Sequence, residues 1–312
     1  MKRAFVTGAS GFIGAAVVRR LLNCGWQVAV LQRTAELGER LRAIAGNLQP
    51  IVASGGKVAD FADAYRDWQP VAVFHLGWAG VSSVHRNDAG LQLGNIQFAV
   101  ELAQLCADCR TPMFLGAGSQ AEYGPKRLLI SEAECPTPTT LYGAAKLSAC
   151  LLTQRIMELA GLQHAWLRIF STYGPGDNPD WLLPSLIRQL LQGQCPPLTA
   201  CEQTWDYLHV DDAAAAFERV AATGATGIFN LASGIFIFFL CMMLVGIAPR
   251  VSTIVSVLLL FTFNERMPYV LGGGDTVLRT VGFILMLSPS IEAMSLQRLF
   301  LQLKHAEKNQ QL

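Results

Sequence analysis

The sequence TGASGFIG, residues 7–14, directly follows the short apolar run Ala4–Val6. Apolar residues then recur at helical spacing until Gly25, and a second apolar run covers Val28–Leu31. A strand, a glycine-rich turn, a helix and a second strand make up the first unit of a doubly wound nucleotide-binding sheet. The sequence therefore predicts that the chain begins with a Rossmann-like α/β unit.

Further apolar runs of strand length follow at Val71–Leu76, Met113–Leu115 and Ala165–Ile169, with helical stretches between them. Strands that alternate with helices indicate a parallel sheet with helices on both of its faces. We therefore expect an α/β fold built on a doubly wound parallel sheet.

The three glycines of residues 7–14 stand three residues apart. In such a turn the first glycine permits the tight bend, the second lets the backbone approach a pyrophosphate, and the third lets the helix pack on the strand. The N-terminus of the following helix adds free N–H groups and the positive end of the helix dipole. We therefore predict that the turn binds a dinucleotide cofactor through Gly8, Ser10, Gly11, Phe12, Ile13 and Gly14.

The end of the second predicted strand indicates which dinucleotide binds. An acidic residue there would bind the ribose 2′-hydroxyl of NAD, whereas this chain has Gln32 and Arg33. Because Arg33 can pair with a 2′-phosphate, the sequence favours NADP(H). NAD(H) is the alternative, with Arg33 as a solvated surface residue. Asp60-Phe61, after a presumed third strand, is a candidate adenine contact, although Asp60 is nearly as consistent with an ordinary loop residue.

Tyr142 and Lys146 are four residues apart, which on a helix places both side chains on one face. A phenol has a pKa of about 10 and exchanges protons poorly at neutral pH. A neighbouring ammonium stabilises the phenolate and lowers that pKa toward neutrality. We therefore expect Tyr142 to be a general acid/base beside a bound nicotinamide, with Ser119 holding the substrate oxygen. A Tyr-x-x-x-Lys spacing alone is common, and the dinucleotide-binding turn gives it weight.

The composition argues against several other classes of function. Lys and Arg total 24 against 23 Asp and Glu, without a basic stripe, so nucleic acid is not an expected partner. Cys106 and Cys109 lack the second pair of a metal site, so we expect reduced thiols and no metal. The N-terminus enters a strand without the apolar core of a signal peptide, and we expect residues 1–234 in the cytoplasm.

Many separate motifs follow one another in a fixed order: TGASGFIG at 7–14, Asp60, FHLGWA at 74–79, Asn95, GSQAEYG at 118–124, YGAAK at 142–146, LRIF at 167–170, YGPG at 173–176, WDYLHVDD at 205–212 and FNLA at 229–232. With these motifs, residues 1–234 resemble the extended short-chain dehydrogenase/reductase family, the NAD(P)-dependent epimerases and dehydratases of nucleotide sugars. The resemblance implies a nucleotide-diphosphate sugar as the substrate and leaves a homodimer open.

The resemblance also implies roles for individual residues. Ser119 would polarise the sugar oxygen, Tyr142 would be the acid/base, and Lys146 would bind the nicotinamide ribose and lower the pKa of Tyr142. The residues that would line the cofactor are Leu76, Gly77 and Trp78, with His75 packed beneath it. The substrate side would contain Gln120, Arg168, Asp206 and Tyr207. Arg168, Asp206 and Tyr207 could equally be structural polar contacts.

Two positions narrow the reaction that the resemblance implies. Sugar 4,6-dehydratases of this family carry an Asp-Glu pair directly after the catalytic Ser/Thr, where this chain has Gln120 and Ala121. Neither residue is a general acid or base, so dehydration is not expected. GSQAEYG and WDYLHVDD are instead similar to family members that reduce 4-keto-6-deoxy nucleotide sugars. We expect a reductase. The alternatives are a nucleotide-sugar 4-epimerase, or a cofactor-binding but inactive truncated or fused chain tethered to a membrane.

After Gly234 the sequence changes character. Residues 235–263 carry one charge, that of Arg250, and a third apolar stretch covers Val277–Pro289. We therefore expect a truncated substrate domain, followed at 235–312 by a hydrophobic helical tail that contacts a membrane through 235–289. A buried soluble core is the alternative.

Five short motifs lie within this tail: VGIAPR at 245–250, NERMP at 264–268, GGGD at 272–275, LR at 278–279 and LSP at 287–289. They make residues 235–312 similar to a fragment of the HTTM domain, a membrane family related to vitamin K-dependent gamma-carboxylase. A fragment cannot carry that family's activity, so we transfer no catalytic residue from it.

Overall fold

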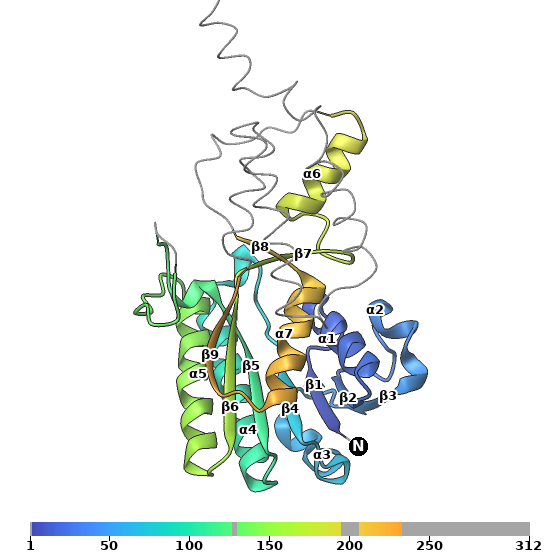
Figure 1. The fold of residues 1–312 in the computed structure, drawn as a ribbon, viewed down its shortest axis with the longest axis vertical. Helices are drawn as coiled ribbons and strands as arrows, with labels where there is room; N and C mark the ends of the chain where they lie inside the picture. The colour runs from blue at the N-terminus through green and yellow to red at the C-terminus, as the bar shows by residue number, and fades with distance from the viewer. Residues whose placement is uncertain (1, 127–129, 195–205, 233–312) are drawn as a thin grey trace, which may run out of the picture. The chain divides into compact units, whose positions relative to one another are not determined.

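The computed structural model of this chain describes residues 2–126, 130–194 and 206–232, which Figure 1 draws in colour. They belong to one compact unit, Met1–Ala232. The expected helical tail, its membrane contact at 235–289 and the HTTM resemblance of 235–312 lie outside the described residues. Within the described residues, no helix is both long enough and apolar enough to span a membrane.

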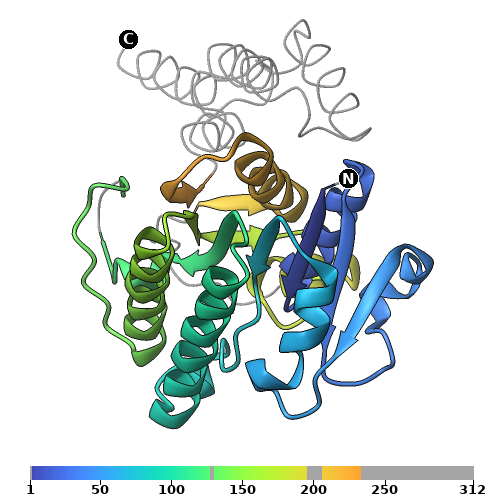
Figure 2. The same ribbon diagram turned by 90° about the horizontal axis from the view of Figure 1, so that it is seen from below.

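A sheet of seven parallel strands forms the centre of this unit, in the order β3-β2-β1-β4-β5-β6-β9 (Figures 1 and 2). The strands are β1 (Arg3–Thr7), β2 (Gln27–Gln32), β3 (Leu48–Val52), β4 (Ala72–His75), β5 (Met113–Ser119), β6 (Gln163–Ile169) and β9 (Gly227–Leu231). This order confirms the doubly wound α/β fold and the strands expected from the apolar runs.

One strand is longer than its apolar pattern indicates. The sequence predicts a strand at Met113–Leu115, whereas β5 continues to Ser119. Its last part contains Gly116 and Gly118, which carry no apolar side chain but lie against the Trp166 ring of β6, where a Cβ atom would collide with that ring. Small residues are required there because the indole fills the space above the strand.

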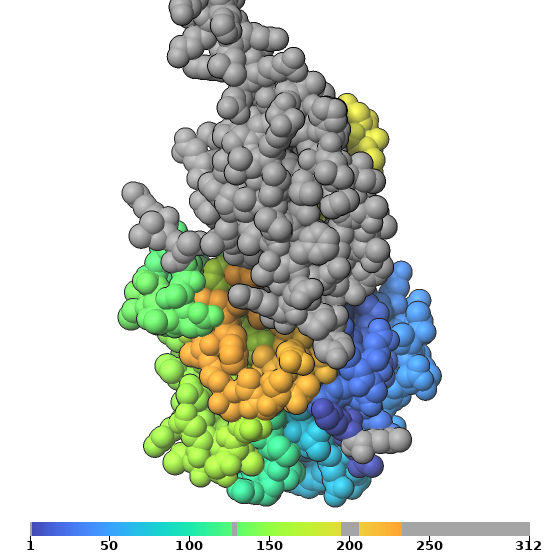
Figure 3. Space-filling model, viewed as in Figure 1, coloured from blue at the N-terminus to red at the C-terminus, as the bar shows by residue number. Residues whose placement is uncertain are grey.

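Helices cover both faces of the sheet. On one face α1 (Phe12–Asn23) packs against α7 (Val210–Thr223), and on the other α4 (Ala89–Asp108) packs against α5 (Leu141–Leu159). Successive residues of a strand point to opposite faces, so Val6 lies in the first core and Phe5 in the second. Figure 3 shows the orange surface of α7 beside the blue surface of the N-terminal residues.

Shorter elements connect these layers. The remaining α-helices are α2 (Glu39–Arg42), α3 (Ala62–Trp68) and α6 (Leu182–Leu191). The 3₁₀ turns are η1 (Ala45–Asn47), η2 (Val58–Asp60), η3 (Ser83–His85) and η4 (Gln120–Glu122). Strands β7 (Ser171–Tyr173) and β8 (Tyr207–His209) form a separate parallel pair.

Backbone contacts hold the turn between β1 and α1. Gly8 has a φ of +70°, and its carbonyl accepts a hydrogen bond from the Gly11 N–H at 3.0 Å. A Cβ atom at Gly14 would collide with the same carbonyl. The first turn of α1 therefore packs directly on the end of β1, as the glycine spacing predicts.

We expect Gly14→Ala to lower the thermal midpoint of the full chain by about 3–8 °C, because overpacking at a backbone contact costs about 1–3 kcal/mol. Gly94→Ala in α4 is the matched control, since a Cβ atom there meets no atom within 4 Å. Alanine's higher helix propensity makes that change neutral or stabilising. Circular dichroism measures both midpoints, and equal midpoints would argue against the close contact at Gly14.

Candidate active site

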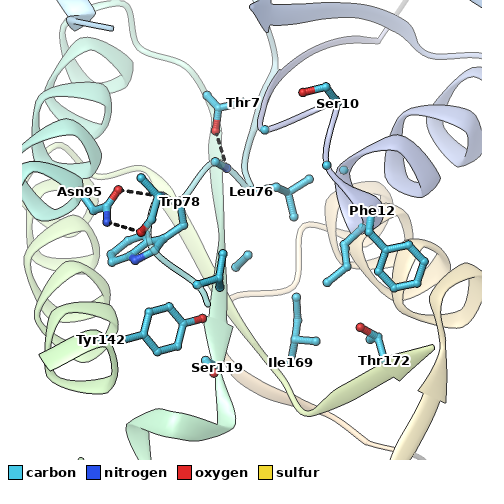
Figure 4. A pocket seen from close by; sticks show the side chains of 18 of the residues that line it. Thr7, Ser10, Phe12, Leu76, Trp78, Asn95, Ser119, Tyr142, Ile169 and Thr172 are labelled. Atoms are coloured by element: carbon cyan, nitrogen blue, oxygen red, sulfur yellow. Dashed lines mark hydrogen bonds between the residues drawn. The ribbon is translucent and has the colours of Figure 1, made fainter. Parts of the chain in front are cut away.

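A cavity of about 1170 Å³ opens at the carboxyl ends of β1, β2, β4, β5 and β6 (Figure 4). Ligands of doubly wound sheets bind at this edge. The predicted site residues that line the cavity are Gly8, Ser10, Gly11, Phe12, Ile13, Gly14, Arg33, Leu76, Gly77, Trp78, Ser119, Gln120, Tyr142, Lys146 and Tyr207. The predicted residues absent from its lining are Asp60, Phe61, Arg168 and Asp206. The volume gives room for a dinucleotide together with a substrate.

The N-terminus of α1 meets this cavity without an anionic group of its own. Its N-cap residue is Gly11, no side chain caps it, and its first turn contains no acidic residue. Gly8 also packs so closely on Gly77 that a Cβ atom would collide with the Gly77 backbone. Free N–H groups in a lining made of backbone suit an anion, so these residues fit the pyrophosphate of a dinucleotide.

The end of β2 contributes charges of both signs. Arg33 is exposed and lines the cavity, as predicted. Glu36 also lines it, and its carboxylate forms an exposed ion pair with Arg42 at 3.0 Å. Glu36 lies in the loop, four residues beyond the strand end, where no sequence motif marks it. The described residues at this end fit either a 2′-phosphate or a 2′-hydroxyl.

The predicted adenine contacts Asp60 and Phe61 are not part of the cavity lining. The Asp60 carboxylate turns back to accept a hydrogen bond from the Lys57 N–H at 3.3 Å. The Phe61 ring is 2% exposed and stacks on Phe5 with the ring centroids 5.5 Å apart. Beyond β3, the cavity is lined instead by Ala53 and Gly56.

Ser119 and Tyr142 meet at the centre of the cavity. Ser119 ends β5, and its Oγ accepts a hydrogen bond from the Ala121 N–H at 3.2 Å. Tyr142 lies in the first turn of α5, where its N–H donates to the Arg86 carbonyl at 2.8 Å. Figure 4 shows the Tyr142 hydroxyl beside Ser119. The two elements therefore bring together side chains 23 positions apart in the sequence.

Burial dominates the proton affinity of Tyr142. Desolvation raises the pKa of this phenol, a hydrogen bond with Ser119 and the positive charge of Arg86 lower it, and the charge of Glu122 raises it, so that the pKa lies above its usual value. The sequence predicts a lowered pKa through Lys146, and the structure corrects this. Arg86, which no motif marks, is the nearby cation, with its guanidinium 5.4 Å from the centre of the Tyr142 ring.

A backbone carbonyl and an indole ring surround the Lys146 ammonium. Its Nζ donates to the Ala117 carbonyl at 2.6 Å and lies 3.9 Å from the centre of the Trp78 ring, but 6.0 Å from that of Tyr142. Burial lowers the pKa of Lys146 to about 7, and the charge of Glu122 opposes this shift. Lys146 is therefore a weaker cation at neutral pH than the sequence pattern implies.

A hydrogen-bonded chain supports the loop after β4. Thr7 Oγ1 accepts a hydrogen bond from the Gly77 N–H at 3.1 Å and lies 2.9 Å from His75 Nδ1. His75 is 2% exposed, and its expected place beneath the cofactor stays a prediction. The Asn95 side chain accepts from the Ala79 N–H at 3.0 Å and donates to the Ala79 carbonyl at 2.9 Å (Figure 4). These contacts fix the backbone that carries Trp78 into the cavity.

The structure places Arg168 and Asp206 away from the lining. Arg168 is 2% exposed, donates from Nε to Glu122 at 2.7 Å and does not line the cavity. The Asp206 carbonyl accepts a hydrogen bond from the Ser171 N–H at 3.3 Å, and its neighbour Tyr207 reaches the cavity instead. The structure thus brings neither Arg168 nor Asp206 into the lining, and their substrate contacts stay predictions.

Solved structures share this architecture. The UDP-N-acetylglucosamine 4-epimerase from Methanobrevibacter ruminantium M1, in complex with UDP-N-acetylmuramic acid, is 26% identical over 78% of this chain and 82% of that one, with a TM-score of 0.68. MoeE5, solved with UDP-glucose and NAD, is 27% identical over 74% of this chain and 76% of that one, with a TM-score of 0.61.

The UDP-glucose 4-epimerase from Thermus thermophilus, solved with NAD, shares the fold at 24% identity over 74% of this chain and 78% of that one, with a TM-score of 0.65. The model of the family described as "NAD dependent epimerase/dehydratase family" matches residues 4–232, nearly all of the compact unit. The chain therefore belongs to the NAD dependent epimerase/dehydratase family.

Proposed function

We propose that this chain is an NAD(P)-dependent oxidoreductase that acts at a carbonyl or hydroxyl carbon of a nucleotide-diphosphate sugar. One observation carries the proposal: the side chains of Ser119 and Tyr142 meet in the same cavity that the glycine turn enters. The complexes of similar proteins with UDP-N-acetylmuramic acid and with UDP-glucose and NAD support both ligand classes. The activity is assigned to residues 1–234, with 235–312 as a separate segment.

The described residues act on the proton and on the substrate oxygen. The bound nicotinamide supplies or accepts the hydride. Ser119 Oγ donates a hydrogen bond to the sugar oxygen, and the Tyr142 hydroxyl delivers a proton to that oxygen as the carbonyl is reduced. Because burial raises the pKa of Tyr142, the phenol rests in its protonated form at neutral pH, which suits this direction. Lys146 binds the ribose beside the nicotinamide, and Gln120 contacts the substrate.

Reduction of a 4-keto-6-deoxy sugar with NADPH is the first candidate reaction. Arg33 at the end of β2 favours NADP(H), and Gln120-Ala121 after Ser119 lacks the acids that dehydration needs. A nucleotide-sugar 4-epimerase is the second candidate, favoured by the similarity to the enzymes of that name. An epimerase returns the hydride to the other face of the same sugar, so it consumes no cofactor.

The absorbance of reduced nicotinamide separates these two reactions. The full chain is mixed with NADPH and a dTDP- or CDP-4-keto-6-deoxyhexose, and a reductase oxidises one NADPH for each sugar. With a UDP-hexose and NAD, an epimerase interconverts the two C4 epimers without net reduction. Cofactor binding without either reaction would identify an inactive chain and overturn the proposed activity.

We expect Tyr142→Phe to lower kcat about 10²–10⁴-fold, because a positioned general acid contributes about that factor. The cofactor Kd should stay within about twofold, since a Phe ring keeps the edge-to-face contact with Trp78, in which the two ring centroids are 6.3 Å apart. Tyr65→Phe removes a phenol that is buried outside the cavity and is the control. Unchanged turnover in Tyr142→Phe would exclude it as the acid/base.

Arg33→Ala should raise the Kd for NADPH about tenfold or more and leave that for NADH within about twofold, because only the 2′-phosphate pairs with the guanidinium. Arg66→Ala is the control, as Arg66 is an exposed arginine that pairs with Asp63 and does not line the cavity. Both constants are measured by quenching of protein fluorescence. Equal losses for the two cofactors would remove the argument for NADP(H).

A further inference from the structure

A buried carboxylate lies directly behind Ser119. Glu122 ends η4, three positions after Ser119, and is 0% exposed. Its Oε1 accepts hydrogen bonds from the Ser119 N–H and the Trp166 Nε1–H, both at 2.9 Å, and its Oε2 accepts one from the Arg168 Nε–H at 2.7 Å. This carboxylate therefore joins the end of β5 to two side chains of β6.

Arg168 connects the carboxylate to the next strand. Its Nη1 donates to the Tyr123 hydroxyl at 2.7 Å, and that hydroxyl donates to Asn230 Oδ1 at 2.9 Å. Asn230 belongs to β9. A continuous set of hydrogen bonds thus crosses β5, β6 and β9.

Stability alone is a weak reason for such a buried pair. Desolvation of two charges largely offsets their attraction, and apolar side chains of equal volume often stabilise a core as well or better. The contact with Ser119 provides a second reason. Glu122 holds the Ser119 N–H while Ser119 Oγ accepts from the Ala121 N–H, which leaves the hydroxyl hydrogen free to point into the cavity.

We propose that Glu122, paired with Arg168, is a positioning residue that fixes Ser119 so that its one hydroxyl hydrogen is donated toward Tyr142 in the ligand-free protein and toward the substrate oxygen when substrate is bound. This inference rests on the proposed function, in which Ser119 holds that oxygen. A small displacement of a hydrogen-bond donor from the reacting geometry costs large factors in rate. Glu122 and Arg168 act through Ser119 and touch neither substrate nor cofactor.

The first test needs no turnover. The full chain contains six tyrosines, and in the cofactor-free protein labelled at tyrosine ¹³Cζ the Tyr142 resonance is the one lost in Tyr142→Phe. Ser119→Ala should shift this resonance by removing the hydrogen bond. Glu122→Gln should shift it in the same direction by at least half as much. Most of that shift should vanish in the Ser119→Ala background, where only the direct effect of the Glu122 charge on Tyr142 remains.

Tyr123→Phe is the matched control. It breaks the link from Arg168 to Asn230 inside the same buried network but leaves all three donors on Glu122. In this variant the Tyr142 resonance should therefore stay unchanged within experimental error, and kcat should stay within about twofold of wild type. Both should hold even if the thermal midpoint of the variant falls. If Glu122→Gln does not fold, Trp166→Phe takes its place. It removes one hydrogen-bond donor from Glu122 Oε1 and keeps the ion pair with Arg168, and its Tyr142 resonance is compared with and without Ser119→Ala in the same way.

The second test is kinetic. Glu122→Gln should lower kcat about tenfold or more with the cofactor Kd within about twofold, and most of this loss in kcat should be absent in the Ser119→Ala background. An unchanged Tyr142 resonance in Glu122→Gln, or equal and additive losses in both backgrounds, would overturn the positioning role. An inactive wild-type chain would overturn the proposed function only, because the resonance still decides the role of Glu122.

Discussion

The packing of backbone on backbone at Gly8, Gly14 and Gly77 determines where every other part of the site lies. Because no side chain separates these residues, α1 begins at the end of β1 and the loop after β4 crosses directly beside it. The N–H groups of α1 and the residues that end β5 consequently line one cavity. A methyl group at Gly14 or Gly8 would push these elements apart. The cavity shared by the dinucleotide site and the Ser119–Tyr142 pair therefore depends on glycine at these positions.

Much of this arrangement could be predicted from local sequence. Glycine spacing predicts the first turn, apolar runs predict the strands, and a four-residue spacing predicts that Tyr142 and Lys146 share a helix face. Arg168 shows the limit of such reasoning. Successive strand residues point to opposite faces, and no short motif states which residues of β6 line the cavity. The sequence therefore predicts a substrate contact for Arg168, whereas its guanidinium pairs with Glu122. Long-range packing also decides how far β5 extends, and a local hydrogen bond to the Lys57 N–H decides where the Asp60 carboxylate points.

The pKa values of Tyr142 and Lys146 could not be predicted from their four-residue spacing either. The ammonium of Lys146 is held by the Ala117 carbonyl and Trp78, and burial acts on it as well as on Tyr142. Desolvation favours the neutral form of each, a phenol and an amine. At neutral pH, therefore, the phenol of Tyr142 is protonated and the amine of Lys146 carries less positive charge than a lysine on a helix surface would. A protonated tyrosine beside a serine hydroxyl is the arrangement that delivers a proton to a carbonyl oxygen.

Transfer of deuterium tests the central claim, oxidoreduction at a sugar carbon, most directly. The full chain is incubated with a nucleotide-diphosphate 4-keto-6-deoxyhexose and reduced cofactor that carries deuterium at both hydrogen positions of the nicotinamide C4, and the product sugar is analysed by NMR and mass spectrometry. The proposed function predicts one deuterium at C4 of the sugar in the wild-type protein and its loss in Tyr142→Phe. Recovery of an unlabelled sugar from the wild-type chain, with the cofactor unchanged, would contradict it.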